Sequence, residues 1–197
     1  LKLVMRDFHA AGFTSVIEMV GGGVVDEDYK VLFELWRRKE LTIRTALNIY
    51  TTKLDDAMRW LHHLPMGFGD EWLKTNGLGE QLLGTVQDNI APTFPLSQAG
   101  LEEYQKLVTE AAKNRWSIQQ HTTLATTAKA YLDIFEAVDR QYPVKDLRWS
   151  LAHIEMISES DLQRMKRLGI GASIQSRQVI GSELMKQAWG EAAASGP

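Results

Sequence analysis

Three residues with side chains suited to metal chemistry fall near the ends of predicted strands. Lys74 lies in EWLKTNGLGE, His121 ends WSIQQH, and His153 ends RWSLAH. Imidazole nitrogens are common ligands of divalent metals. A lysine ammonium cannot bind a metal because its lone pair carries a proton, but a desolvated neutral amine can take up carbon dioxide and become an anionic carbamate. We therefore take Lys74, His121 and His153 as candidate catalytic and metal-binding residues.

Each candidate also has a purely structural interpretation. His121 and His153 could be core histidines with satisfied hydrogen bonds, or caps of the helices that follow them. Lys74 could lie on a solvent-exposed strand edge, because burying its ammonium group in a short strand would be costly. The residue types alone leave both interpretations open.

Side-chain alternation along the strands supports a position in the barrel interior more clearly for His121 than for His153. Gln119 and His121 share one face of their strand, whereas Ile118 lies on the other, so the apolar face suits packing against helices and His121 is expected to face a barrel interior. The face of His153 also carries large apolar residues, so alternation supports it less clearly. Glu155 follows two residues later and could orient an imidazole through its second nitrogen, as metal-bound histidines usually require.

Strand and helix signals alternate along the chain. The expected strands cover residues 14–19, 42–50, 71–76, 116–121, 147–153 and 170–174. The expected helices cover residues 3–11, 28–38, 52–63, 101–114, 125–141 and 158–168. The connection 77–97 is rich in glycine and proline, and long connections of this kind are often functional. The end of the chain, GEAAASGP, is predicted to be frayed.

Strands that alternate with helices imply parallel strands joined by crossover helices. Two architectures fit this order, an open doubly wound sheet and a (β/α) barrel. No GxGxxG or P-loop pattern follows a strand, which favours the barrel. A complete eight-unit barrel needs about 250 residues. We therefore predict a single α/β domain over residues 1–197 that forms a partial (β/α)8 TIM barrel with about six of the eight βα units, the first and last strands being absent.

Composition excludes several classes of function. The 197 residues include no cysteine, which rules out disulfides, zinc–thiolate sites and cysteine nucleophiles. A net charge of -3 argues against nucleic acid or an anionic membrane as the main partner. No apolar run is long enough to span a bilayer, so we expect no membrane association and a cytoplasmic location. The chain begins with Leu1 inside a helical pattern, and we expect it to be part of a longer protein.

Four stretches together resemble a known family. They are AAGFTSVIEM, WLKTNGLGE, WSIQQH and LAHIEMISESDLQRMKRLGIGASIQ. In these stretches the chain is similar to the amidohydrolase superfamily, in particular to the amidohydrolase-3 group of YtcJ-like and N-substituted formamide deformylase-like enzymes. The last stretch is the most specific, because it combines a histidine, a helix that begins Ser-x-x-Asp and a Leu-Gly-Ile strand. The resemblance covers residues 1 to 180.

The resemblance assigns roles to the three candidates. Lys74 matches the carboxylated bridging lysine of the family, and His121 and His153 match the ligands at the ends of its fifth and sixth strands. The His-x-His pair of the first strand has no counterpart here, and the aspartate of the last strand would lie beyond Pro197. Two local departures are LAH in place of IEH and GLGEQ in place of a Gly-x-Leu-Gly-Ser turn.

By resemblance, the chain is a metal-dependent amidohydrolase that hydrolyses a C–N bond of a small amide-like substrate with a metal-activated hydroxide. One or two divalent ions are implied, with zinc favoured as the metal. Because ligands are missing from the chain, we expect it to be inactive or weakly active by itself. Exposed barrel edges predict a homo-oligomer.

Two other functions remain open at this point. The first is a non-catalytic barrel fragment that acts as a binding or assembly module through its strand edges. The second is an open-sheet α/β enzyme that uses Glu18 or Asn76 at strand ends without a metal. Metal binding would separate the metal-dependent hydrolase from the open-sheet enzyme. The sequence upstream of Leu1 would separate it from the assembly module, because a His-x-His strand there would restore the metal site.

Overall fold

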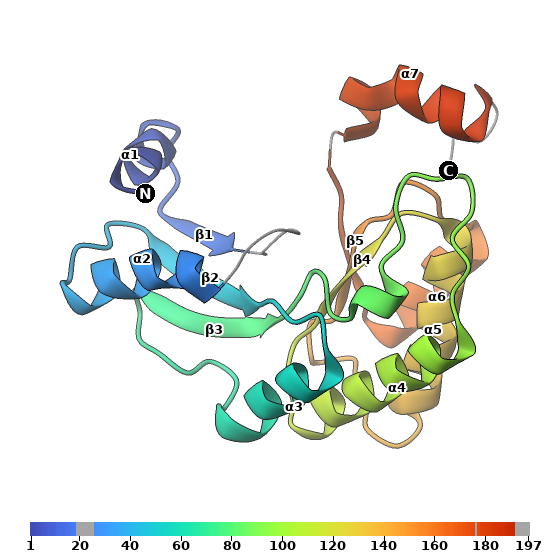
Figure 1. Cartoon of the computed structure of the whole chain (residues 1–197), viewed down its shortest axis with the longest axis horizontal. Coiled ribbons are helices and arrows are strands. Elements are labelled where there is room, and N and C mark those ends of the chain that lie inside the picture. The colour runs from blue at the N-terminus through green and yellow to red at the C-terminus, as the bar shows by residue number, and fades with distance from the viewer. Residues whose placement is uncertain (19–25, 176, 192–197) are drawn as a thin grey trace.

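Strands and helices alternate through almost the whole chain (Figure 1). The computed structural model describes residues 1–18, 26–175 and 177–191. The described strands are β1 Ser15–Glu18, β2 Arg44–Ile49, β3 Leu73–Leu78, β4 Gln119–Thr122, β5 Ser150–His153 and β6 Gly171–Ser173. The described helices are α1 Lys2–Ala10, α2 Asp26–Arg37, α3 Leu54–His63, α4 Gln98–Lys113, α5 Ala125–Asp139, α6 Glu159–Leu168 and α7 Arg177–Trp189, with the short 3-10 helix η1 Gly84–Val86. None of these described helices has the length and apolarity that crossing a membrane requires.

All strand pairs within the described residues are parallel. They form two three-stranded sheets, β1-β2-β3 and β4-β5-β6. The sheets meet where β3 ends, because Leu78 bridges to Ile118 and its N–H donates to the carbonyl of Ser117 at 3.0 Å. Two residues later the N–H of His121 donates to the carbonyl of Glu80 at 2.9 Å. These contacts confirm the α/β fold with parallel strands, whereas the count of six units out of eight stays a prediction.

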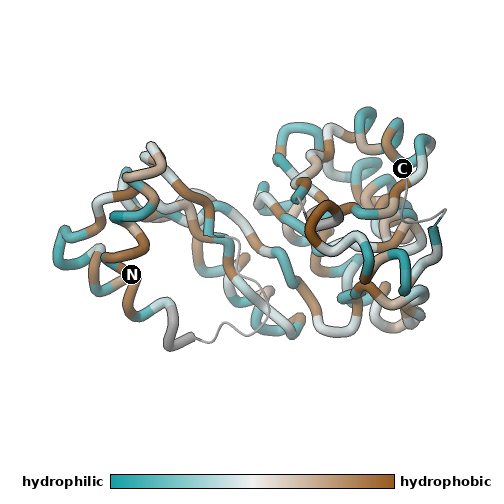
Figure 2. Tube along the Cα trace, turned by 90° about the horizontal axis from the view of Figure 1, so that it is seen from above, coloured by the Kyte–Doolittle hydropathy of each residue, from teal (hydrophilic) through white to brown (hydrophobic). Residues whose placement is uncertain are grey.

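The sheets bury their helix-facing sides and leave the opposite side polar. A large core packs α3 to α6 against the strands around the buried aromatic residues Tyr104, Trp116, Tyr131, Phe135 and Trp149. A smaller core lies beneath α1 and α2. Hydrophobic and hydrophilic stretches consequently alternate along the trace in both parts of the molecule (Figure 2). All six strands or their immediate ends line one hollow of about 520 Å³ on the other side, through residues that include Ile17, Asn48, Lys74, Asn76, Ser117, Gln119, Ser150 and Ser173.

The boundaries of helix α6 follow from local sequence signals at its two ends. The hydroxyl of Ser158 accepts a hydrogen bond from the N–H of Asp161 at 3.1 Å and donates one to its carboxylate at 2.7 Å. Ser158 is therefore the N-cap of α6, and the Asp161 side chain contacts it three residues later, as the Ser-x-x-Asp pattern predicts. At the other end Gly169 has φ +70°, the left-handed conformation that glycine adopts at low cost. Both ends of α6 are therefore fixed by local signals, the side chain of Ser158 at one end and the backbone of Gly169 at the other.

Several elements differ from the sequence prediction. Strands β4 and β5 each begin three residues later than predicted, and helix α4 begins three residues earlier. Strand β3 lies at Leu73–Leu78, two residues later than the predicted 71–76, because its pairing with β2 continues through Gly77. Helix α7 was not predicted, since Val179, Ile180 and Leu184 are exposed and give it no single apolar face. Of the predicted frayed tail, residues 192–197 lie outside the described residues, as do the three glycines at 21–23.

Replacing Arg164 with methionine is expected to lower the free energy of unfolding by about 1–2 kcal/mol near neutral pH. The guanidinium of Arg164 joins α6 to α5 through hydrogen bonds of 2.9 and 3.0 Å to Glu136. The hydrogen bond from Arg164 is the main cause of a lowered pKa at Glu136. A carboxyl group with a pKa lowered by folding stabilises the protein above its unfolded pKa, and this stability is lost as the pH falls.

Urea denaturation of the wild type and of Arg164→Met at about pH 7 and about pH 3 tests this prediction. The difference between the two proteins should shrink at the lower pH. Arg167→Met is the matched control, because Arg167 is 66% exposed and lies 3.7 Å from the same carboxylate. An equal loss of stability in the Arg167 variant would contradict the assigned role of Arg164.

Candidate metal centre

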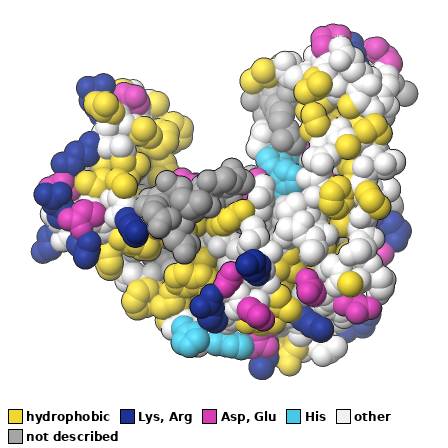
Figure 3. All heavy atoms as spheres, in the orientation of Figure 1, with side chains coloured by type: hydrophobic (Ala, Val, Ile, Leu, Met, Phe, Trp, Pro, Cys, Tyr) yellow, Lys and Arg dark blue, Asp and Glu magenta, His cyan; other side chains and the backbone are white. Residues whose placement is uncertain are grey.

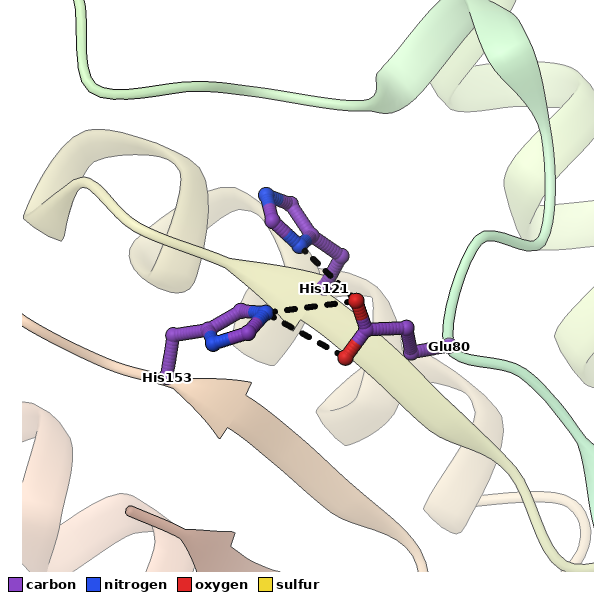
Figure 4. Close-up of side chains that lie close together, drawn as sticks. All are labelled: Glu80, His121 and His153. Atoms are coloured by element: carbon purple, nitrogen blue, oxygen red, sulfur yellow. Dashed lines mark hydrogen bonds and ion pairs between the residues drawn. The ribbon is translucent and has the colours of Figure 1, made fainter. Parts of the chain in front are cut away.

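Three side chains of types that can bind a metal gather where β3, β4 and β5 end (Figure 4). His121 lies in β4, His153 is the last residue of β5, and Glu80 follows the end of β3 by two residues. One donor atom from each of the three lies within 4.8 Å of the others. Histidine atoms are visible in the hollow between the two arms of the molecule in Figure 3. In parallel α/β folds this end of the strands is where reactive groups usually lie.

Both imidazoles turn one nitrogen toward the carboxylate of Glu80. The Nδ1 atom of His121 lies 3.4 Å from Oε1. The Nε2 atom of His153 lies 3.3 Å from Oε1 and 3.2 Å from Oε2. The two rings are 4.6 Å apart between centroids and inclined at 68°. Two nitrogens and a carboxylate therefore converge on one small volume (Figure 4).

Glycines allow Glu80 to reach this position. Gly79 has φ +140°, and a Cβ atom there would lie 2.4 Å from the carbonyl oxygen of Gln119. A Cβ atom on Gly77 would lie 2.5 Å from the carbonyl oxygen of Ser117. Real side chains do not fit at such distances, so only glycine lets the end of β3 lie this close to β4. The same close approach brings Glu80 beside the histidine of β4.

His153 is held in an unusual backbone conformation. It has φ +72°, and the next residue, Ile154, has φ +45°. Left-handed conformations cost about 1–2 kcal/mol for residues other than glycine. The N–H of Ile154 donates to the carbonyl of Thr122 at 2.8 Å, which ties the chain after β5 to β4. Backbone strain of this kind concentrates at functional sites, because it fixes a side chain in one direction.

The two histidines dominate the electrostatics of Glu80. Burial of its carboxyl group raises its pKa, but the neighbouring imidazoles of His121 and His153 outweigh this effect and lower the pKa to about 2. Glu80 is therefore anionic at neutral pH. The side chains of His121, Glu80 and His153 are only 11%, 14% and 5% exposed. The centre thus holds a negative charge between two imidazoles, largely shielded from water.

The donor atoms fit a divalent cation. Nδ1 of His121 is buried and makes no hydrogen bond in the described structure, although it faces Glu80. An unpaired buried nitrogen is costly unless a proton donor or a cation occupies the space in front of it. Two imidazole nitrogens and one carboxylate form a donor set found in catalytic zinc sites and suit other first-row metals as well.

Lys74 does not join this group. It lies on β3, is exposed, and precedes the last residue of that strand by four positions. At a rise of about 3.3 Å per residue, this places its backbone roughly 13 Å before the strand end where the histidines lie. The carboxylate beside His121 and His153 comes instead from Glu80. A metal-binding role for Lys74 stays a prediction.

Sequence reasoning missed Glu80 as a donor. Its only signal was that GLGEQ departs from the Gly-x-Leu-Gly-Ser turn of the amidohydrolase superfamily, which the sequence resembles. The predicted orienting role of Glu155 also finds no support, because Nδ1 of His153 has no hydrogen-bond partner in the described structure. Asn76, a candidate in the metal-free alternative, donates to Asn48 at 2.8 Å. Glu18 lies outside the candidate metal centre.

A comparison with family models decides the family. Residues 1–196 match the model of the amidohydrolase family. The chain belongs to the amidohydrolase family. This confirms the resemblance inferred from the sequence stretches around His121 and His153. A comparison with curated proteins found no match for this member of the family.

Solved structures share the fold of this amidohydrolase. An uncharacterized metal-dependent hydrolase from Pyrococcus furiosus has a TM-score of 0.76 at 17% identity, over 98% of this chain and 41% of that one. An uncharacterized metal-dependent hydrolase from Pyrococcus horikoshii has a TM-score of 0.74 at 18% identity, over 98% of this chain and 39% of that one. Guanine deaminase from C. acetobutylicum, solved with guanine in its active site, has a TM-score of 0.56 at 12% identity, over 95% of this chain and 44% of that one. The chain thus spans about two fifths of the length of these proteins.

Proposed function

We propose that the chain carries three ligands of a divalent metal centre in a hydrolase that cleaves a C–N bond of a small amide-like substrate. The observation that carries this proposal is the convergence of Glu80, His121 and His153 at the strand ends. Membership of the amidohydrolase family supports the reaction class. We propose zinc as the metal, because its catalytic sites commonly use three protein ligands drawn from histidine and carboxylate groups.

Each residue has a defined part in this centre. Nδ1 of His121 and Nε2 of His153 are the nitrogens turned toward Glu80, so they are the proposed donors. The anionic carboxylate of Glu80 offsets part of the charge of a cation. A divalent ion held there would supply Lewis acidity toward a substrate carbonyl and would lower the pKa of water. The largely buried walls keep bulk water from competing for these groups.

The isolated chain is proposed to be inactive or weakly active. The first-strand His-x-His pair and the last-strand aspartate of the resembling family have no counterpart in residues 1–197. A barrel that contains the six described strands as six of its eight units would place these groups beside β1 and β6. Hydrolysis of simple formamides and amides, measured with and without added zinc, tests the proposed activity. Little or no hydrolysis, and none without zinc, is the expected result. Rapid hydrolysis without zinc would contradict both the metal dependence and the weak activity proposed for the isolated chain.

Replacing Lys74 with methionine is expected to leave zinc affinity unchanged, with or without bicarbonate. The reason is geometric, because the ammonium group starts from a position well before the strand end. Calorimetric titration with zinc in buffers with and without bicarbonate is the measurement. A loss of zinc binding in Lys74→Met, or tighter binding by the wild type in bicarbonate, would instead support a carboxylated lysine ligand.

A second candidate function is a non-catalytic assembly module. It is favoured by exposed apolar residues at the outer strands, since Ile17 in β1 is 55% exposed and Ile174, next to β6, is 77% exposed. Each of these strands pairs on one side only within the described residues. Unpaired edges recruit other strands, so we expect homo-oligomers at micromolar concentration. A single monomeric species in sedimentation velocity would contradict this expectation.

A further inference from the structure

Asp88 brings a buried carboxylate from the long connection 77–97 to the far side of His121. Its side chain is 0% exposed. Its carboxylate accepts hydrogen bonds from the N–H groups of Thr123 and Leu124 at 2.9–3.0 Å and from the hydroxyl of Thr127. It therefore caps the start of α5, directly after the strand that carries His121. No sequence pattern indicated this role.

The segment that carries Asp88 is held firmly by other side chains. The buried hydroxyl of Tyr131 donates to the carbonyl of Val86. The indole of Trp189 donates to the carbonyl of Ile90 at 2.9 Å, so α7 holds the other side of the segment. These contacts on both sides of Asp88 fix the carboxylate in space. A carboxylate so fixed can select the orientation and the tautomer of a neighbouring imidazole.

The second nitrogen of His121 faces this carboxylate. Nε2 lies 3.3 Å from Oδ1 of Asp88 and 3.4 Å from the hydroxyl of Thr123. A neutral imidazole carries one N–H, on either Nδ1 or Nε2. Oδ1 of a carboxylate that already accepts from backbone donors offers only lone pairs to the ring. An Nε2 atom with its own lone pair would be repelled by Asp88, whereas an Nε2–H group is attracted. Glu80 faces Nδ1 in the same way at 3.4 Å, but it also faces His153, whereas Asp88 lies at 3.3 Å from Nε2 and is fixed by backbone donors. Asp88 is therefore the carboxylate that holds the proton of His121.

We propose that Asp88 is a positioning residue that keeps the proton of neutral His121 on Nε2 and leaves the lone pair of Nδ1 directed at Glu80. This inference deepens the proposed function and rests on it for the identity of the ligand. Because Asp88 also caps α5, the same carboxylate couples the start of that helix to the orientation of the metal-binding ring. The hydroxyl of Thr123 also lies beside Nε2 of His121 and helps to fix the orientation of the ring.

The tautomer can be measured directly in the metal-free protein. Imidazole nitrogen shifts of His121, assigned by NMR with ¹⁵N-labelled histidine in mildly alkaline buffer, report which nitrogen carries the proton. The expected result is Nε2–H in the wild type. A proton on Nδ1 of wild-type His121 would overturn the inference without any substitution.

Asp88→Asn is the decisive variant. The asparagine oxygen can keep accepting from Leu124 and Thr127, and the amide nitrogen then occupies the place where Oδ1 faces His121. That nitrogen donates a hydrogen bond, so we expect the proton of His121 to move to Nδ1 and zinc affinity to fall by a factor of about 10–100. A variant that retains Nε2–H and binds zinc as tightly as the wild type would overturn the inference.

Thr127→Val is the matched control for a merely structural role. It removes one donor to Asp88 and weakens the cap, but leaves the carboxylate facing His121. It should lower thermal stability while retaining Nε2–H and zinc affinity, and a shift of the proton to Nδ1 in this variant would count against a specific role for Asp88. Failure of the wild type to bind zinc would contradict the proposed function, and the tautomers of the metal-free proteins would still decide the role of Asp88.

Discussion

Zinc affinity is expected to fall by a factor of more than about 100 when Glu80 is replaced with glutamine. Structural zinc sites with four ligands bind with about 10–16 kcal/mol, which is roughly 3 kcal/mol for each ligand. Glutamine retains the size of glutamate but removes the negative charge that lies between His121 and His153. The amide nitrogen can also donate to an imidazole and block its lone pair. Calorimetric titration of both proteins with zinc measures the effect.

Glu110→Gln is the matched control for this substitution. Glu110 also contacts a histidine, since its Oε1 lies 3.0 Å from Nε2 of His62, but this pair lies away from the strand ends, on helices α4 and α3. Its substitution should leave zinc affinity unchanged. If Glu80→Gln binds zinc as tightly as the wild type, the carboxylate is not a ligand, and Lys74 becomes the stronger candidate.

Gly79→Ala is expected to destabilise the protein by about 2–4 kcal/mol and to weaken zinc binding at the same time. The new methyl group would lie 2.4 Å from the carbonyl oxygen of Gln119, and φ +140° is unfavourable for any residue with a side chain. The clash can be relieved only if the end of β3 moves away from β4. Such a movement takes Glu80 away from His121.

Gly67→Ala separates backbone strain from this clash. Gly67 has φ +81°, but a Cβ atom there has no atom within 4 Å. Its substitution should cost about 1 kcal/mol and leave zinc affinity unchanged. Thermal denaturation and zinc titration of both variants test the comparison. Equal losses of stability in the two variants would show that the approach of β3 to β4 is not as close as the structure places it.

Local signals were sufficient to predict most of the elements. The order of strands and helices followed from side-chain periodicity and from caps such as Ser158 and Gly169, because these act within one turn of the chain. The burial of Trp116 and Ile118 in the core, just before β4, agrees with the predicted apolar face of this segment. Helix α7 lacks a periodic apolar face and therefore gave no signal.

The composition of the candidate centre was less accessible from sequence. His121 and His153 could be proposed because each ends a strand, and the structure brings them together. Glu80 depends on where β3 ends and on how closely it approaches β4, and Asp88 depends on a contact across 35 residues of sequence. Such contacts are set by tertiary packing, and the local sequence pattern of a connection does not report on it. Lys74 was favoured by its place near the end of the predicted strand 71–76 and by family resemblance, but β3 continues to Leu78.

The most direct test of the metal centre is the zinc content of the chain after equilibrium dialysis, compared with that of a His121→Ala/His153→Ala double variant. The structure predicts about one zinc ion per chain in the wild type, because three donors converge on one volume. The double variant should retain almost none, since only Glu80 remains of the three. A wild-type chain without bound zinc, or equal zinc contents in the two proteins, would contradict the assignment of these residues as a metal centre.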